Sequence, residues 1–122
     1  MTIEIIGLFT NIPQEEGAQA TQEALDERET KIVPTKFIVR LLELIQSNNI
    51  FQFYSELFSQ QIGDAMGQGH VPDTANIFLD RKIDRKINEI ASQLLNSGLN
   101  PLYFIKRFLD DIFQIFLGTT KE

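Results

Sequence analysis

The sequence predicts an α+β domain with the element order β-α-α-β-β-α-β-β. Its composition, 43% hydrophobic and 23% charged residues, is typical of a globular chain. Apolar residues recur at three- and four-residue steps in the segments expected to be helical. The segments expected to form strands are rich in β-branched and aromatic residues and end at turn-forming residues. The length of 122 residues favours a single domain, which we expect to span residues 1–122.

The first half of the chain predicts a strand followed by two helices. Residues 2–9 are largely β-branched and aromatic, and the run stops before Pro13, so we expect a buried strand. Residues 14–28 are rich in Glu, Gln and Ala, with acids in the first turn where the helix dipole favours them. A second helix begins at Pro34-Thr35. The apolar residues expected to face the core from this helix are Phe37, Ile38, Leu41, Leu42 and Ile45.

The second half predicts two β-hairpins separated by a long helix. Residues 50–54 and 57–61 form the first hairpin, with Ser55-Glu56 as its turn. The helix begins at Pro72-Asp73 and ends near Leu95, before an Asn-Ser-Gly sequence that stops it. Two apolar runs, residues 102–109 and 112–117, then flank Asp110-Asp111. These runs predict a tight hairpin that carries both carboxylates at its tip.

Charge and residue usage exclude several classes of function. The chain has 11 Lys and Arg against 17 Asp and Glu, a net charge of −6, which is a poor whole-surface match for nucleic acid. The absence of Cys excludes disulfides, thiolate metal sites and a cysteine nucleophile. No apolar stretch approaches the roughly 18 residues typical of a membrane span. We therefore expect an intracellular protein, nuclear or cytoplasmic, without a membrane partner.

Asp110-Asp111 is the dipeptide with the clearest chemical content. Adjacent carboxylates in an apolar setting repel each other and are costly to desolvate, so they add little to stability. Mg²⁺ removes this objection, because it binds carboxylate oxygens and takes further ligands from substrate phosphates. Glu4, in the first strand, is the candidate third acid for a two-ion site. The alternative interpretation is a solvated turn, which Asp commonly occupies.

Three segments of the chain together carry a resemblance to a known family. They are residues 6–13, Ile-Gly-Leu-Phe-Thr-Asn-Ile-Pro, residues 62–67, Ile-Gly-Asp-Ala-Met-Gly, with their continuation to Leu79, and residues 107–113, Arg-Phe-Leu-Asp-Asp-Ile-Phe. In this order they resemble the first catalytic motif, the second motif and the third motif, a two-aspartate hairpin, of the reverse-transcriptase palm of the Penelope-like, retroelement type. The resemblance implies an antiparallel palm sheet with helices packed on one face, truncated so that the fingers and thumb are absent.

The resemblance also implies roles for single residues. Asp110 matches the principal metal-binding aspartate, and Asp111 its partner. Glu4 falls where the family has an aspartate that bridges both ions. Phe9 matches the aromatic residue that bars a ribose 2′-hydroxyl by steric exclusion, while Met66 and Gly67 match the part that lines the incoming nucleotide and template. Beside the hairpin tip, Lys106 and Arg107 are the expected electrostatic partners of the two aspartates.

By this resemblance the chain is a catalytic fragment of an RNA-directed DNA polymerase. The implied reaction joins a deoxynucleoside triphosphate to a primer 3′-hydroxyl, with Mg²⁺ or Mn²⁺ as cofactor and an RNA template and DNA primer as partners. Without fingers and thumb, we expect the isolated chain to be weakly active or inactive. The alternative is a non-catalytic relic that acts as an acidic protein-interaction module and self-associates through its phenylalanine-rich strands.

Overall fold

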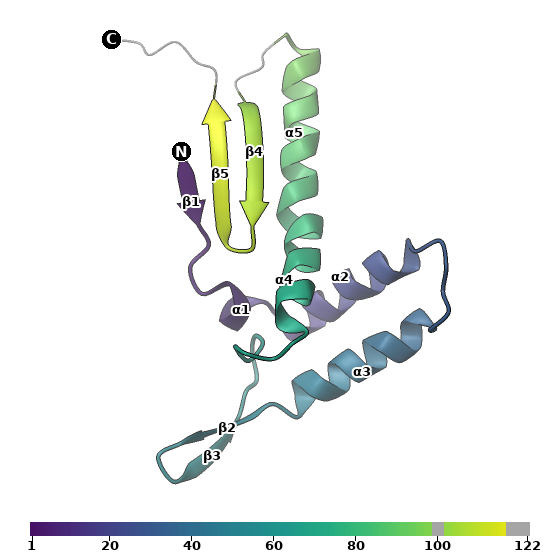
Figure 1. The fold of residues 1–122 in the computed structure, drawn as a ribbon, viewed down its shortest axis with the longest axis vertical. Helices are drawn as coiled ribbons and strands as arrows, with labels where there is room; N and C mark the ends of the chain where they lie inside the picture. Colours follow the sequence, from purple (N-terminus) through teal and green to yellow (C-terminus); the bar gives the residue numbers. More distant parts are fainter. Residues whose placement is uncertain (99–101, 117–122) are drawn as a thin grey trace. The chain divides into compact units, whose positions relative to one another are not determined.

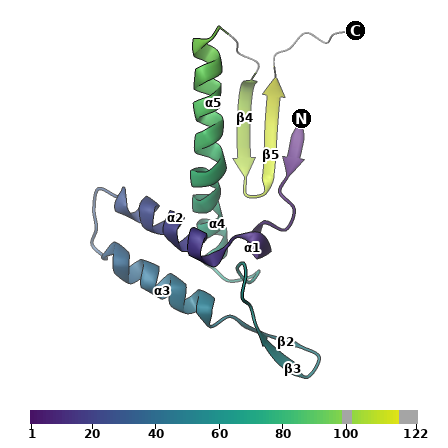
Figure 2. The same ribbon diagram turned by 180° about the vertical axis from the view of Figure 1, so that it is seen from behind.

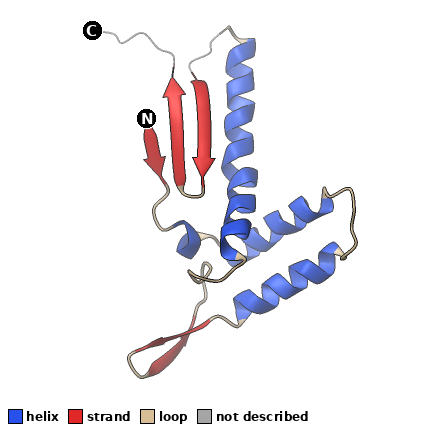
Figure 3. Cartoon of the chain, in the orientation of Figure 1, coloured by secondary structure: helices blue, strands red, loops and turns tan. Residues whose placement is uncertain are grey.

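A computed structural model describes residues 1–98 and 102–116 and has the predicted α+β class with antiparallel strands (Figures 1 and 3). Its elements, in chain order, are β1 (Thr2–Glu4), α1 (Leu8–Asn11), α2 (Gln14–Asp26), α3 (Thr35–Ser47), β2 (Ile50–Phe53), β3 (Glu56–Ser59), α4 (Val71–Leu79), the π-helix η1 (Asp80–Asp84), α5 (Arg85–Asn96), β4 (Leu102–Phe108) and β5 (Asp111–Phe116). No helix among the described residues has both the length and the apolar character needed to cross a membrane.

The chain divides into two compact units, which we describe separately. The sheet unit consists of Met1–Ile6 and the described part of Leu79–Glu122, and the central unit is Gly7–Phe78. A single domain over residues 1–122 therefore stays a prediction. Glu4, Asp110 and Asp111 belong to the sheet unit, whereas Phe9, Met66 and Gly67 belong to the central unit.

The sheet unit is built on three antiparallel strands in the order β1-β5-β4 (Figure 1). Backbone hydrogen bonds join the N-terminal segment to β5 at both ends of their pairing. The Ile5 amide donates to the Asp110 carbonyl at 2.8 Å, and the Gln114 amide donates to the Met1 carbonyl at 2.9 Å. Helix α5 runs beside β4, as Figures 1 and 2 both show. Strand β1 and the β4–β5 hairpin are therefore held in one sheet although they are far apart in sequence.

The first predicted strand is shorter than expected, and its three residues are exposed instead of buried. The strand over residues 2–9 is wrong beyond Glu4, because Leu8–Asn11 forms the short helix α1. Gly7 takes a left-handed conformation, with φ of 62°, which breaks the extended backbone. The Asn11 side-chain amide and the Thr10 hydroxyl both donate to the Gly7 carbonyl, at 2.8 and 3.1 Å, and fix the turn.

Helix α3 buries a face that matches the prediction only in part, because Leu42 is buried and Ile38 is half-buried as expected. Its buried positions are Thr35, Val39, Leu42 and Gln46, which follow one line along the helix. Phe37, Leu41 and Ile45 are instead 44–58% exposed. The apolar residues of α3 extend over more than half of its circumference, so hydrophobic periodicity alone does not identify the buried side.

The hairpins and the long helix also differ in detail from prediction. The turn of the β2–β3 hairpin is Tyr54-Ser55, one residue earlier than expected. In the β4–β5 hairpin, Phe108 is opposite Asp111, so the loop is Leu109-Asp110 and Asp111 begins β5. Residue 117, the predicted end of this strand, lies outside the described residues. Between the hairpins the helix contains the π-helical segment η1, which periodicity did not predict.

In the central unit, α1 meets the loop before α4 through direct backbone contact. The Asp64 amide donates to the Phe9 carbonyl at 2.8 Å. The Gln14 side-chain amide donates to the Gly63 carbonyl at 3.0 Å. Gly63 has φ of 73°, and a Cβ atom there would lie 2.3 Å from the Thr10 carbonyl oxygen. Only glycine fits this approach, which brings the first and second predicted motifs together.

We expect Gly63→Ala to lower the free energy of unfolding by about 2 kcal/mol or more, because the new methyl group clashes with backbone that cannot rotate away. Urea unfolding followed by circular dichroism measures this change. Gly69→Ala is the matched control, since Gly69 lies in the same loop and a Cβ there meets no atom within 4 Å. Equal losses in the two variants would contradict the packing described for Gly63.

Candidate metal and nucleotide site

Strand pairing brings Glu4 next to the two-aspartate hairpin. In the β1–β5 register Glu4 lies opposite Asp111, and Asp110 is joined to the neighbouring Ile5 through its backbone carbonyl. Residues directly opposite in an antiparallel pair project to the same face, with Cβ atoms about 5 Å apart. The predicted adjacency of an N-terminal acid and the hairpin aspartates is therefore present in the sheet unit.

The three-stranded sheet has one face that carries the acids and one that is partly covered. Glu4, Asp111 and Phe108 are opposite one another across the three strands and share the first face. The neighbouring positions Ile112 and Arg107 alternate to the second face. Ile112 is 6% exposed and the Arg107 side chain 10% exposed, whereas Glu4 and Asp111 are exposed. The acids thus stand on the open face, where a ligand can reach them.

A shallow hollow of about 470 Å³ lies beside Asp111. Its lining includes Phe108 and Lys106 from β4, Phe113 from β5 and Thr2 from β1. By the strand register these side chains belong to the acid-bearing face. The hollow therefore combines carboxylate, ammonium and aromatic groups. The prediction from sequence missed Thr2, Phe108 and Phe113 as site residues, although the alternation of β4 and β5 would have placed Phe108 and Phe113 on one face with Asp111.

The three acids offer the right donor type for a hard cation, since Mg²⁺ prefers carboxylate oxygens. Within residues 1–98 and 102–116, none of their carboxylates takes part in an ion pair or side-chain hydrogen bond. Across the same residues, no group of three or more Asp, Glu, His or Cys side chains is gathered closely enough to hold an ion. Glu4 and Asp111 therefore form a pair of adjacent carboxylates, with Asp110 at the neighbouring tip. Metal binding by the three stays a prediction.

The tip of the β4–β5 hairpin has a backbone conformation that is uncommon for its sequence. Leu109 has φ of 52°, in the region that favours glycine, while Asp110 does not. Positive φ at the first of two loop residues is the pattern of a type II′ turn. The Arg107 guanidinium donates to the Leu109 carbonyl at 3.2 Å and holds this turn. Asp110 is therefore presented on a short loop with little conformational freedom.

The expected partnership of Arg107 with the two aspartates is wrong. Its guanidinium instead forms a bidentate ion pair with Asp84 of η1, at 2.6 Å from Nη2 to Oδ2 and 3.0 Å from Nε to Oδ1. The strand alternation explains the difference, because Arg107 projects to the face opposite that of Asp111. Lys106 projects to the acid-bearing face and lines the hollow beside Asp111. The ion pair fixes η1 to β4.

The predicted nucleotide-contacting residues lie in the central unit. Phe9 is half-buried, and its carbonyl accepts a hydrogen bond from Asp64. Met66 is 75% exposed, and Gly67 has φ of 95°, where a Cβ atom would meet no other atom within 4 Å. Phe9 therefore contacts the loop that contains Met66 and Gly67, through the hydrogen bond from the Asp64 amide. Gly67 combines a conformation that favours glycine with open space through which another molecule can approach its backbone.

Asp64 is a buried carboxylate that the sequence did not mark as such. It is 2% exposed and accepts a hydrogen bond at 2.9 Å from the side-chain amide of Gln46, itself 3% exposed. The Nε2 atom of His70 lies 3.8 Å from the same carboxylate oxygen. A buried carboxylate needs a donor such as the Gln46 amide to offset its lost hydration. These contacts give Asp64 a structural role in holding the loop to α3.

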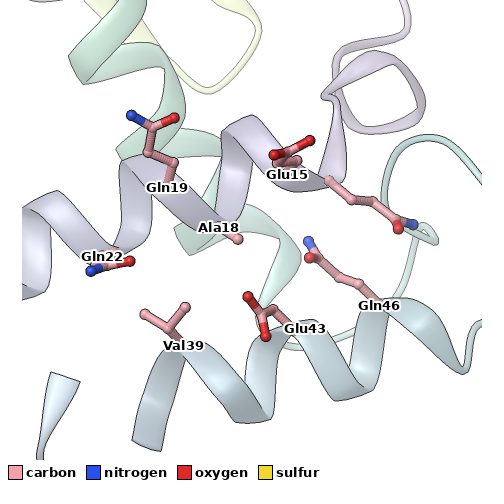
Figure 4. Close-up of a pocket in the computed structure, with 8 residues that line it drawn as sticks. Glu15, Ala18, Gln19, Gln22, Val39, Glu43 and Gln46 are labelled. Carbon is pink, nitrogen blue, oxygen red and sulfur yellow. The ribbon is translucent and has the colours of Figure 1, made fainter. Parts of the chain in front are cut away.

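A second hollow, of about 380 Å³, lies between α2 and α3 (Figure 4). Side-chain amides of both helices and the carboxylates of Glu15 and Glu43 surround it, with Ala18 and Val39 as apolar contributions. None of the residues predicted from sequence to contact a metal or nucleotide lines it. The hollow offers hydrogen bonds to a polar molecule, and it shares no lining residue with the hollow beside Asp111.

The chain was compared with family models, curated proteins and solved structures, and none of them matches it. The candidate site consists of the Glu4–Asp111 pair, the turn at Leu109-Asp110 and the hollow on the open face of the sheet.

The Arg107–Asp84 pair gives a testable difference between two acids of η1. We expect Asp84→Asn to lower the free energy of unfolding by about 2 kcal/mol, because it leaves a largely buried guanidinium without its counter-charge. Asp80→Asn should cost about 0.5 kcal/mol or less, since the Asp80–Arg85 pair is half exposed. Chemical denaturation of both variants measures the contrast. Equal losses of unfolding free energy in the two variants would show that the Arg107–Asp84 pair stabilises the chain no more than the exposed Asp80–Arg85 pair.

Proposed function

We propose that this chain carries the catalytic face of a reverse-transcriptase palm and supports RNA-directed synthesis of DNA. The observation that carries the proposal is the pairing of Glu4 with Asp111 beside the Asp110 turn. Three motif-like segments and an acid-bearing open sheet face agree with it. The reaction is attack of a primer 3′-hydroxyl on the α-phosphorus of a deoxynucleoside triphosphate, with pyrophosphate as the leaving group.

In this proposal the sheet residues hold and orient the reacting groups. Glu4, Asp110 and Asp111 would hold Mg²⁺ or Mn²⁺, which supplies charge stabilisation to the phosphoryl oxygens when bound. Lys106, which lines the hollow beside Asp111, is placed to attract a phosphate. Phe108 and Phe113 offer apolar surface in the same hollow to a sugar or base. The rigid turn at Leu109 keeps Asp110 in one position.

The proposed partners are an RNA template, a DNA primer and a deoxynucleoside triphosphate. Phe9 would exclude a 2′-hydroxyl by steric contact, and Met66 and Gly67 would line the nucleotide and template. The net charge of −6 gives this chain little general attraction for nucleic acid. Fingers and thumb segments would supply the missing basic contacts. An intracellular location, nuclear or cytoplasmic, belongs to this proposal.

A second candidate function is a non-catalytic, acidic interaction module of the same retroelement origin. Glu4 and Asp111 form a pair and Asp110 lies apart at the hairpin tip, and among the described residues no three potential metal ligands lie close together. This arrangement favours the second candidate. The exposed apolar residues of the β2–β3 hairpin also favour it. The two candidates differ in whether the chain catalyses template-dependent synthesis.

The first test is primer extension on an RNA template with Mg²⁺ or Mn²⁺. We expect Asp110→Asn and Asp111→Asn each to lower the extension rate at least about 100-fold, because each removes a carboxylate from the reacting centre. Asp26→Asn is the control, since Asp26 is an exposed acid whose only described ion pair joins it to Lys31 at 3.7 Å. Background synthesis that is equal in all variants would reject catalysis and favour the interaction module.

A second test uses stability and is independent of activity. Like charges directly opposite in a sheet destabilise it, so Asp111→Asn should raise the unfolding temperature in metal-free buffer by about one to two degrees. Added Mg²⁺ should stabilise the unsubstituted chain and have less effect on this variant. Differential scanning calorimetry measures both effects. The Asp26→Asn control should keep the full Mg²⁺ response, and a response that Asp111→Asn leaves unchanged would rule out metal binding at this pair.

A further inference from the structure

The β2–β3 hairpin exposes nearly all of its apolar side chains. All eight strand positions are exposed, including Phe53 at 61% and Leu57 at 72%. Phe51 and Phe58 stack at 5.7 Å between ring centroids but remain 50% and 41% exposed. A two-stranded hairpin of this kind is only marginally stable in water without further strands or a covering layer. Its exposure therefore calls for a specific partner.

The hydrogen-bond pattern identifies which backbone groups of the hairpin are unpaired. The Gln60 amide donates to the Asn49 carbonyl at 2.8 Å, so this pair is hydrogen-bonded. Because such pairs alternate along an antiparallel ladder, the amides of Ile50 and Gln52 point away from β3. Among the described residues neither amide has a partner. The outer edge of β2 therefore offers donors and acceptors at two alternate positions.

Charge distinguishes the two edges of the hairpin. Residues 48–63 contain one charged residue, Glu56, and it lies on β3. Strand β2, Ile-Phe-Gln-Phe, has no charge, no proline and no glycine to protect its edge. In a chain with a net charge of −6, this neutral edge is where two copies meet with little repulsion. The occupant that fits is thus a second copy of the chain.

We infer that two copies associate through antiparallel pairing of their β2 strands about a two-fold axis at Phe51. In this register Ile50 lies opposite Gln52 of the second copy, so the unpaired amides and carbonyls of both strands bond to each other. Phe51 faces its equivalent across the axis. The Phe58–Phe51 stack of each copy then continues into the other, and a four-stranded sheet with a row of four phenylalanines replaces two exposed hairpins.

Sedimentation velocity of the full chain over a series of concentrations tests the inference. We expect a monomer–dimer equilibrium that Gln52→Pro weakens about tenfold to a hundredfold, because proline removes the outward amide from each copy. An outward amide is also the edge position at which a strand tolerates proline. Ser59→Pro is the matched control. The backbone amide of Ser59 points outward from the β3 edge, which takes no part in the proposed dimer, so dimerisation should persist. Each substitution also removes one side-chain hydrogen bond, with Tyr54 or Gln61 as the other member.

Hydrogen exchange separates edge pairing from other contacts. Exchange of the Ile50 and Gln52 amides should slow as the protein concentration rises, whereas exchange of the Leu57 and Ser59 amides should not. Ile50→Lys, which places a charge on the β2 edge without changing the backbone, should also weaken the dimer. A chain that stays monomeric at all concentrations would overturn the inference. So would a dimer lost in Ser59→Pro but kept in Gln52→Pro, or association that continues without limit beyond two copies.

Discussion

The pairing of three residues of β1 with β5 is the constraint on which the proposed site depends. A shift of one residue in that register would move Glu4 to the opposite face of the sheet, away from Asp111. The pairing covers only three residues of β1, so the hydrogen bonds at its two ends help to fix the register. The Ile5 amide bonds to the Asp110 carbonyl at one end, and the Met1 and Gln114 backbones exchange two hydrogen bonds at the other. These bonds determine which acids are neighbours.

A second constraint acts in the central unit, where Gly63 contacts the backbone of Thr10. This contact leaves no room for a Cβ atom, and it is reinforced by the Asp64–Phe9 and Gln14–Gly63 hydrogen bonds. It joins two segments more than fifty residues apart, residues 6–13 and 62–67, whose contact the sequence did not predict. Buried Asp64 adds a polar link from the same loop to Gln46 of α3. The segments that resemble the first and second motifs, residues 6–13 and 62–67, therefore contact each other in the central unit.

The local elements were predictable from sequence, whereas most long-range contacts were not. Helix α3 begins at Thr35 as Pro34 indicated, and the aspartates lie at a tight hairpin as the flanking apolar runs indicated. The buried side of α3 was only partly predictable, because its apolar residues cover more than one face. The Arg107–Asp84 pair spans 23 residues and depends on which face of β4 meets η1. Sequence periodicity contains no information on that choice.

The two faces of the three-stranded sheet carry different charged groups. On one face, Arg107 is bound to Asp84 and so contributes no charge compensation to Asp111 on the other. Glu4 and Asp111 are exposed and opposite each other, and neither has a described cationic partner. Like charges directly opposite in a sheet destabilise it modestly.

The same guanidinium also bonds to the Leu109 carbonyl and holds the turn that carries Asp110. Tyr54, in the β2–β3 hairpin, has nearly the same positive φ, so the backbone conformation itself is a property of a two-residue loop. What distinguishes Leu109 is its connection to η1 through Arg107. Arg107 therefore holds the hairpin tip from the covered face of the sheet, while Glu4 and Asp111 lie on the open face.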